Sequence, residues 1–400
     1  MESRDEAAVV VIGGMVLDVN ATASSMAANP RTTVPGKVLY MLGGVGRNVA
    51  ECMSKLGEKP FMISVVGYDL AGSFLLESWK YAGLSDEGIQ RKQDIDTGVV
   101  CNVFDGKGEL AAGIASAEAI EKFLTPQWIG NFKSKICSAP MLMLDANLSD
   151  SALLASCQLA VECRTPVWFE PVSVTKSKRI ASIVRHVTFT SPNEDELIAM
   201  ANVLSPGDKF SPIPRDNDTA NLSIGSLFQM LKPAIWVLLH SGVRIVVATL
   251  GSHGVFLCFE ATYGAKRHDH TRKASSSFST KLYDSINLCC VSNSILSSRK
   301  TNRRSSYIAI HFPALPASVA RLTGAGDCLV GATIASYCAG LDIMQSVAVG
   351  IAAAKGAVES ELNVPADYEL TKISGTIVCS FLSLMFCFRF CCFAHDFPCR

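Results

Sequence analysis

The residues best suited to chemistry form the stretch Thr323-Gly324-Ala325-Gly326-Asp327, which runs directly into an apolar segment ending at Ala339. A glycine-rich turn that opens into a helix leaves the first N–H groups of the helix unpaired, and the helix dipole adds partial positive charge there. Such a turn binds anions. Asp327 stands at its mouth, where a carboxylate can take the proton of an attacking hydroxyl, as phosphoryl transfer requires. The alternative is a structural turn in which Asp327 only caps the helix.

A second glycine-rich helix start occurs earlier in the chain, at Gly43-Gly44-Val45-Gly46-Arg47-Asn48. Val49, Met53 and Leu56 follow at helical spacing, and Gly57 is a natural C-terminal stop. The sequence therefore predicts two helix N-termini that suit polar or anionic ligands.

The segment from Ala7 to Ile12 is continuously apolar and rich in β-branched residues, which predicts a buried parallel strand that ends at Gly13-Gly14. Ligands of open α/β sheets bind at the carboxyl ends of the strands. Asp18 and Asn20 follow within a few residues, so we expect both to reach a polar ligand. The alternative is that they are solvated loop residues.

The same pattern of an apolar strand, polar or glycine residues and then a helix recurs, which predicts a doubly wound, mostly parallel sheet flanked by helices. The recurring strands are expected at residues 61–66, 141–144, 166–169, 187–190 and 245–250. Asp105-Gly106-Lys107-Gly108 is a hairpin signal between two further strand candidates. A hairpin among βα units indicates a small antiparallel sheet that can serve as a lid over the site.

Composition excludes several classes of function. The 36 basic and 36 acidic residues give a net charge of zero, so no nucleic-acid partner is expected. The N-terminus is acidic and lacks an apolar core, so we expect no secretory signal. No CxxC pair occurs among the 15 cysteines, and scattered ones such as Cys52, Cys157 and Cys338 are interpreted as small buried apolar groups.

Two segments interrupt the pattern. Residues 264–306 are rich in Ser, Lys, Arg and Thr and are interpreted as a disordered insertion. The tail, residues 369–400, is rich in Cys and Phe, and three interpretations compete for it: a marginal membrane anchor, an extra buried element, or sequence foreign to the fold, such as translated intron. We favour the last, and expect no membrane partner.

Five motifs in this order resemble the signatures of the ribokinase-like, or PfkB, carbohydrate kinases. They are the two glycine-rich helix starts together with Gly67-Tyr68-Asp69-Leu70-Ala71-Gly72, Asn193-Glu194-Asp195-Glu196 and Thr249-Leu250-Gly251-Ser252-His253-Gly254. Within the family, Pro35-Gly36-Lys37 and Glu170-Pro171-Val172-Ser173 resemble the pseudouridine kinases, most of all the plant type. The resemblance implies a kinase domain over residues 7–263 and 307–368, with a small β lid from about 18–42 and 97–114.

The resemblance also implies roles for individual residues. Asp327 would act as the general base toward a 5′-hydroxyl, beside the phosphoryl cradle of Gly324, Ala325 and Gly326. Residues implied to bind the acceptor are Asp18, Asn20, Gly43, Gly44 and Asn48. Residues implied to bind the nucleotide are Asn193, Glu196, Thr249, Gly251 and Gly254, with Glu196 holding Mg²⁺ through water.

The implied activity is ATP- and Mg²⁺-dependent phosphorylation of pseudouridine at its 5′-hydroxyl. A monovalent cation such as K⁺ and a homodimer are left open. Alternatives are a kinase for ribose, another nucleoside or a sugar, and an inactive isoform that only binds a ligand or a partner. The expected location is cytoplasmic or peroxisomal, although the chain ends in Phe397-Pro398-Cys399-Arg400 and not in a Ser-Lys-Leu type signal.

Overall fold

Apolar, β-branched segments form a ten-stranded sheet in the computed structural model, which describes residues 8–24, 32–105, 110–205, 207, 210–213, 222–260, 284, 286, 307–368 and 386–390. Its strands, in spatial order, are β14 (Phe386–Phe390), β13 (Tyr307–Phe312), β12 (Val255–Glu260), β11 (Ile245–Thr249), β10 (Phe189–Thr190), β9 (Val167–Glu170), β8 (Leu142–Asp145), β1 (Val10–Ile12), β4 (Phe61–Gly67) and β5 (Ile89–Lys92). The seven strands from β11 to β5 pair in parallel, and β12 to β14 extend the sheet antiparallel.

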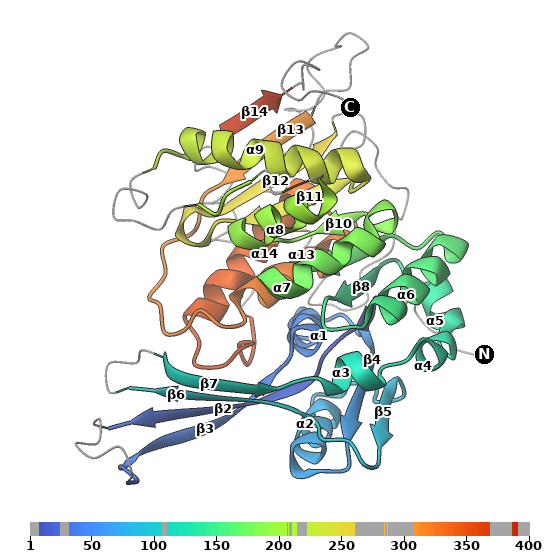
Figure 1. Cartoon of the computed structure of the whole chain (residues 1–400), viewed down its shortest axis with the longest axis vertical. Coiled ribbons are helices and arrows are strands. Elements are labelled where there is room, and N and C mark those ends of the chain that lie inside the picture. The colour runs from blue at the N-terminus through green and yellow to red at the C-terminus, as the bar shows by residue number, and fades with distance from the viewer. Residues whose placement is uncertain are drawn as a thin grey trace.

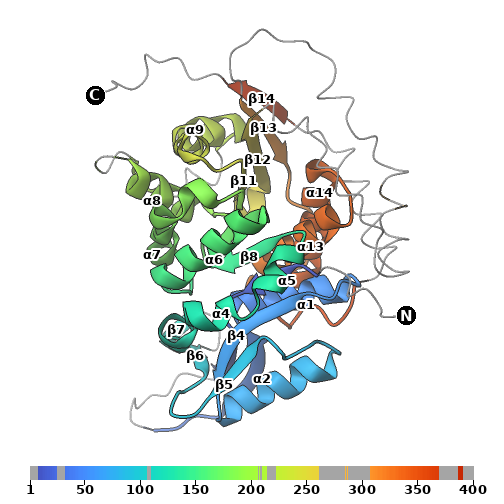
Figure 2. The same ribbon diagram turned by 90° about the vertical axis from the view of Figure 1, so that its right-hand side faces the viewer.

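Helices cover both faces of this sheet (Figure 1, Figure 2). One face carries α1 (Val45–Lys55), α2 (Leu70–Tyr81), α13 (Ala325–Cys338) and α14 (Ile343–Val358). The other carries α3 (Ala119–Phe123), α4 (Pro126–Gly130), α5 (Lys133–Ser138), α6 (Asp150–Cys163), α7 (Val174–Ser177), α8 (Glu194–Leu204) and α9 (Ile224–Ser241). Alternate strand residues face the two layers, because Val11 packs into the first core and Val10 and Ile12 into the second. The predicted doubly wound fold is confirmed.

The strand order reverses between β1 and β8. From β1 the chain moves to β4 on one side, and the later strands β8 to β11 add on the other side. The reversal opens a crevice beyond the carboxyl ends of β1 and β8, where ligands of such sheets bind. The residues after these two strands, Gly13 and Ala146, therefore border the candidate site.

A separate four-stranded sheet projects from the main body (Figure 1). Its order is β3 (Gly36–Gly43), β2 (Val16–Ala23), β6 (Gly98–Phe104) and β7 (Leu110–Ser116). A small sheet was expected from about 18–42 and 97–114, and the four strands span residues 16–23, 36–43, 98–104 and 110–116. Of the expected hairpin at 105–108, residues 106–108 lie outside the described residues. The interpretation of Asp18 and Asn20 as loop residues was wrong, because both lie within β2, paired with Met41 and Leu39 of β3.

Close contact between α1 and α13 sets the position of both glycine-rich helix starts. Gly331 lies at the contact, where an added Cβ would stand 2.6 Å from the Val49 carbonyl oxygen and 2.9 Å from the Cys52 Cβ. Gly350 of α14 approaches α13 in the same way, with Thr333 Oγ1 only 2.2 Å from its ideal Cβ position. Small residues at these points allow three helices to pack at short interaxial distance.

The free cysteines named from the sequence are buried as expected: Cys52, Cys157 and Cys338 lie in the two cores. A disulfide between Cys137 of α5 and Cys163 of α6 was not anticipated. The sequence offered no signal for it, because the two residues are 26 positions apart and outside any paired motif.

The described residues include only part of the two atypical segments. Nearly all of residues 264–306 lies outside the described residues, and so does most of the tail. Residues Phe386–Phe390 of the tail form β14, the edge strand of the main sheet, antiparallel to β13. Among the helices that the structure describes, none has the length and apolar character to cross a bilayer.

The helix contact at Gly331 predicts a matched pair of substitutions. Gly331→Ala should lower the free energy of unfolding by about 1–3 kcal/mol, because the new methyl group collides with the backbone of α1. Gly225→Ala, in the first turn of α9, meets only Ser223 Oγ at 3.8 Å and should keep stability or raise it by up to about 1 kcal/mol. Urea unfolding followed by tryptophan fluorescence measures both. Equal stability of the two variants would contradict the close packing of α1 on α13.

Candidate functional site

Asp145 joins three backbone segments at the point where the strand order reverses. It lies at the carboxyl end of β8 and is fully buried. Its carboxylate accepts hydrogen bonds from the N–H groups of Gly14 at 2.8 Å, Gly46 at 3.1 Å and Asn147 at 3.0 Å. Burial raises its pKa, and these hydrogen bonds oppose the rise. Asp145 therefore holds the glycine-rich turn before α1 against the end of β8.

The predicted base, Asp327, meets the predicted acceptor-binding residue Asn48 across this crevice. Asn48 Nδ2 donates to Asp327 Oδ2 at 2.6 Å, and the two residues come from the first turns of α1 and α13. Burial raises the pKa of Asp327 to about 6, with a smaller rise from the neighbouring carboxylate of Asp145. The hydrogen bond from Asn48 and the charge of Arg47 act in the opposite direction. A carboxylate with this pKa is ionised near neutral pH and is a stronger base than a solvated aspartate.

The predicted anion site lies at the start of α13. Gly324 is its N-cap with φ of 87°, and an added Cβ there would stand 2.1 Å from the carbonyl oxygen of Asn363, so glycine is required on two grounds. The Ala325 N–H turns back toward the Leu322 carbonyl at 3.4 Å. The next two N–H groups, of Gly326 and Asp327, are left for a ligand. Gly326 is exposed, and an added Cβ would meet nothing within 4 Å, so a phosphoryl group has room to approach.

Asp18, predicted to bind the acceptor, lies where β2 packs against the loop before α1. An added Cβ on Gly43 would stand 2.4 Å from Asp18 Oδ2, so glycine at this position makes room for the carboxylate. Asn363 Nδ2 donates to Asp18 Oδ2 at 2.9 Å and to the Leu42 carbonyl at 3.0 Å. Burial raises the pKa of Asp18, while Asn363 and the charges of Arg47 and Arg321 lower it. Asn363 was not among the residues predicted from the sequence.

Asn20 is engaged elsewhere. Its side chain accepts a hydrogen bond from Asn102 of β6 at 3.0 Å and donates to the sulfur of Met41 at 3.2 Å. Only 4% of the residue is exposed. These two contacts lie within the small sheet, two residues along β2 from Asp18.

Gly44 precedes α1 with φ of 94°, and an added Cβ would stand 2.4 Å from the Gly14 carbonyl oxygen. A side chain here would be strained in conformation and would also collide with the backbone after β1. The two glycine turns at positions 13–14 and 43–44 therefore pack directly on each other.

The predicted nucleotide residues gather at the carboxyl ends of β10 and β11. Asn193 and Glu196 form a reciprocal capping box at the start of α8, with both hydrogen bonds at 2.9 Å. Asn193 also forms a parallel β-bridge with Thr249. Asn193 and Glu196 thus have a structural role in capping α8. The sequence alone did not distinguish this role from nucleotide binding.

Gly251 and Gly254 form the tight turn between β11 and β12, with φ of 53° and 95°. At Gly254 an added Cβ would stand 2.0 Å from the Phe312 carbonyl oxygen, so the turn packs against the end of β13. At Gly251 an added Cβ would meet nothing within 4 Å. The open side of this turn therefore faces away from the sheet.

Glu170, at the end of β9, links the two halves of the site electrostatically. Burial raises its pKa well above the usual range, and the charges of Glu196, Asp327 and Asp145 raise it further, while a hydrogen bond from Ser191 lowers it. Among the described residues no group of three or more side chains is arranged to ligate a metal directly. Mg²⁺ is commonly held by one or two carboxylates, waters and substrate phosphates, so the acidic oxygens of Glu170 and Glu196 fit it as an outer donor set.

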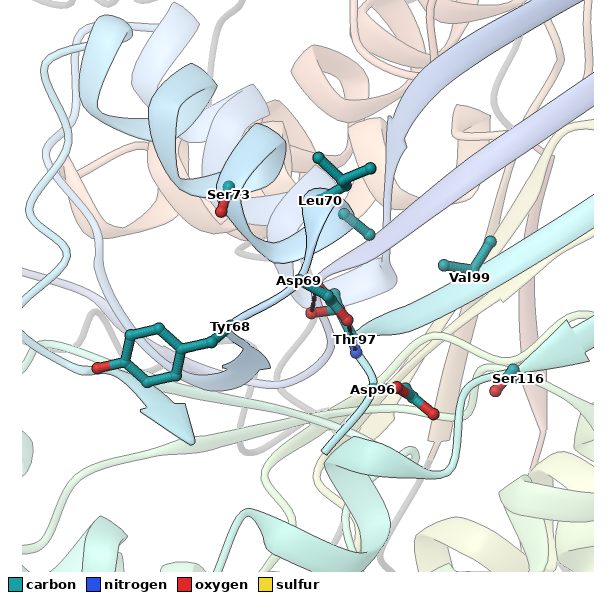
Figure 3. A pocket seen from close by; sticks show the side chains of 9 residues that line it. Tyr68, Asp69, Leu70, Ser73, Asp96, Thr97, Val99 and Ser116 are labelled. Carbon is teal, nitrogen blue, oxygen red and sulfur yellow. Dashed lines mark hydrogen bonds between the residues drawn. The ribbon is translucent and has the colours of Figure 1, made fainter. Parts of the chain in front are cut away.

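The motif at residues 67–72 acts at the base of the small sheet. Asp69 caps α2 by accepting from the Gly72 N–H at 2.7 Å, and also accepts from the Thr97 N–H at 2.6 Å and hydroxyl at 2.7 Å. Burial raises the pKa of Asp69, but these hydrogen bonds lower it more. Figure 3 shows Asp69 and Thr97 against each other in an open pocket of about 750 Å³, whose lining also includes Tyr68 and Ser116. This pocket has none of the predicted site residues in its lining.

Residues 6–286 match the model of the pfkB family carbohydrate kinases. A pseudouridine kinase from Arabidopsis thaliana is 52% identical over 366 residues, which cover 92% of this chain and 94% of that protein. A pseudouridine kinase from Escherichia coli (strain K12) is 26% identical over 253 residues, which cover 63% of this chain and 73% of that protein.

Solved structures share the fold. The ribokinase of Arabidopsis thaliana, complexed with ribose and ATP, superposes with a TM-score of 0.66 at 17% identity, covering 93% of this chain and 98% of that one. A putative sugar kinase from Clostridium perfringens gives the same TM-score at 19% identity, covering 96% and 98%. Because the family model spans more than half of the chain and the Arabidopsis relative is similar over nearly its whole length, the protein belongs to the pfkB family of carbohydrate kinases.

Proposed function

We propose that this protein transfers the γ-phosphoryl group of ATP to the 5′-hydroxyl of pseudouridine. The chemistry rests on one observation above all: the Asp327 carboxylate stands at the start of α13, beside unpaired backbone N–H groups and hydrogen-bonded to Asn48. The acceptor rests on the 52% identity to a pseudouridine kinase, which extends over 92% of this chain.

In the proposed reaction, Asp327 takes the proton of the 5′-hydroxyl as that oxygen forms a bond to the γ-phosphorus. The bond between the γ-phosphorus and the β,γ-bridging oxygen breaks, and ADP leaves with the electron pair. The N–H groups of Gly326 and Asp327 stabilise the charge of the moving phosphoryl group. Asp18 and Asn48 hold the acceptor so that its hydroxyl lies next to the base.

The nucleotide lies, in this proposal, along the carboxyl ends of β10 and β11, with Asn193, Thr249 and Gly251 beside it. Mg²⁺ would neutralise phosphate charge when bound, and Glu196 and Glu170 would hold it through water. This proposal requires no rearrangement of the main sheet, because these residues all lie at or just beyond the carboxyl ends of β9, β10 and β11.

Turnover with a panel of acceptors tests the proposed function. ADP release by the purified protein with MgATP should be fast with pseudouridine and at least about tenfold slower with uridine, adenosine or ribose, because a mismatched acceptor leaves polar groups of the site unpaired. Fast release with ribose or adenosine and none with pseudouridine would replace the acceptor. No release with any of the four would favour a protein that only binds its ligands.

The role of Asp327 predicts the effect of removing its charge. Asp327→Asn should lower kcat by about two to four powers of ten, because general-base catalysis is lost while the shape of the site is kept. ATP affinity, measured by calorimetry, should stay nearly unchanged. Asp86→Asn makes the same chemical change at an exposed ion pair with Lys80 and serves as the control. Activity of Asp327→Asn within a few-fold of the unaltered protein would refute the assignment.

The pKa of Asp327 predicts the pH profile. The base works only when ionised, so kcat/KM should be constant above about pH 6 and fall about tenfold per unit below it. The profile of kcat/KM reports the free protein, which is the state described here. A midpoint near 4, the usual value for aspartate, would show that a differently placed group limits the reaction.

A further inference from the structure

We propose that Arg47 is a positioning residue that fixes the side-chain amide of Asn48 and thereby keeps a hydrogen-bond donor aimed at Asp327. This inference rests on the proposed function, in which Asp327 is the base. Arg47 itself needs no contact with the acceptor or the nucleotide for this role.

Arg47 is held rigidly. Only 3% of the residue is exposed, although it is an arginine in the first turn of a helix. Its Nε donates to the Gly43 carbonyl at 3.0 Å and its Nη2 to the Leu42 carbonyl at 2.9 Å. Its Nη1 pairs with Glu51, one turn further along α1. The guanidinium is therefore fixed by the loop before the helix and by the helix itself.

The second N–H of Arg47 Nη2 reaches Asn48. Nη2 donates to Asn48 Oδ1 at 2.7 Å, and Asn48 Nδ2 donates to Asp327 Oδ2 at 2.6 Å. A guanidinium only donates and an ionised carboxylate only accepts, so a single orientation of the amide satisfies both neighbours. A rotated amide would set donor against donor at Arg47 and acceptor against acceptor at Asp327.

Loss of this constraint acts directly on the base. An amide free to rotate can present its oxygen to Asp327, and that contact is favourable only when Asp327 is protonated and cannot accept a proton. The charges facing Asp327 add to this effect: Asp145 from β8 and Asp18 from β2 raise its pKa, Glu170 from β9 interacts with it as a like charge, and Arg47 from α1 lowers it. Arg47 thus keeps Asp327 ionised both through the amide and through its own charge.

Lysine cannot replace arginine here. The fork of the guanidinium contacts two backbone carbonyls, Glu51 and Asn48 in different directions, whereas an ammonium group is a compact point donor on a flexible stem. The competing interpretation is that Arg47 only stabilises the turn at Gly43, in which case stability changes but the pH dependence of catalysis does not.

The test compares Arg47→Lys, Asn48→Ala and the double variant with the unaltered protein, using Lys55→Met in the last turn of α1 as the control. Arg47→Lys should lower kcat by about 10- to 100-fold with little change in the KM for ATP, because the base is misplaced. The acid limb of kcat/KM should move up by about one pH unit. The double variant should lose no more activity than Asn48→Ala alone, since Arg47→Lys keeps the positive charge and so removes only the effect that passes through Asn48.

A second variant keeps the test valid if Arg47→Lys folds poorly. Arg47→Met combined with Glu51→Met removes the ion pair without leaving a buried charge unpaired, a replacement that folded proteins commonly tolerate. It should show a similar fall in kcat and an alkaline shift of the acid limb at least as large, because the positive charge beside Asp327 is lost as well. An unmoved acid limb in both variants, or losses from Arg47→Lys and Asn48→Ala that multiply in the double variant, would overturn the inference.

The assay also separates failure of this inference from failure of the proposed function. If the unaltered protein phosphorylates a different acceptor, the same comparison is made with that acceptor. If it phosphorylates none, the carboxyl titration of Asp327 is followed by ¹³C NMR, with Asp327→Asn to assign the signal. A pKa of Asp327 that is equal in Arg47→Lys and the unaltered protein would then overturn the inference without any turnover.

Discussion

The hydrogen bond from Asn48 to Asp327 joins two points of the chain that are 279 residues apart, and much of the site depends on it. It can form only if the N-termini of α1 and α13 meet. Their meeting requires the close helix contact at Gly331. It also requires Asp145, which attaches the glycine-rich turn before α1 to the sheet. A hydrogen bond of 2.6 Å does not pull two helices together, because its net contribution is about 1 kcal/mol, or somewhat more with a charged acceptor. The hydrophobic packing brings the helices into contact, and the hydrogen bond sets the direction of the reacting groups.

The carboxyl edge of the sheet collects buried and half-buried acidic groups at some cost in stability. Asp145, Glu170, Glu196 and Asp327 all have raised pKa values, with burial as the largest cause at each. Repulsion among these carboxylates is weakest when a cation and backbone N–H groups face them. A protein selected only for stability would replace such a cluster with apolar residues, so the cluster is best explained by ligands that carry charge into the site.

The sequence predicted the parts of the site that have local patterns. A glycine pair before a helical repeat marks each helix start, and an apolar run before a polar residue marks the end of each parallel strand. Asp145 and Glu170 were visible as strand-end residues, but their burial and their partners depend on which strands become neighbours. Asn363 follows the last helix in an undistinguished segment, and its contact with Asp18 spans 345 residues, so local patterns give no signal for it. Strand β2 was missed because it carries polar residues and its partners, β3 and β6, come from separate segments that local patterns do not connect.

Asn363 also explains how the two sides of the site stay in register. Asp18 and Leu42 belong to the small sheet, whereas the Asn363 carbonyl packs on Gly324 at the start of α13. A shift of the small sheet relative to the main sheet would therefore stretch contacts with the same residue that supports the anion site. The side chain of Asn363 holds the proposed acceptor side and its backbone packs against the proposed phosphoryl side, so the separation of the two is set within one residue and not by the flexibility of the loops between them.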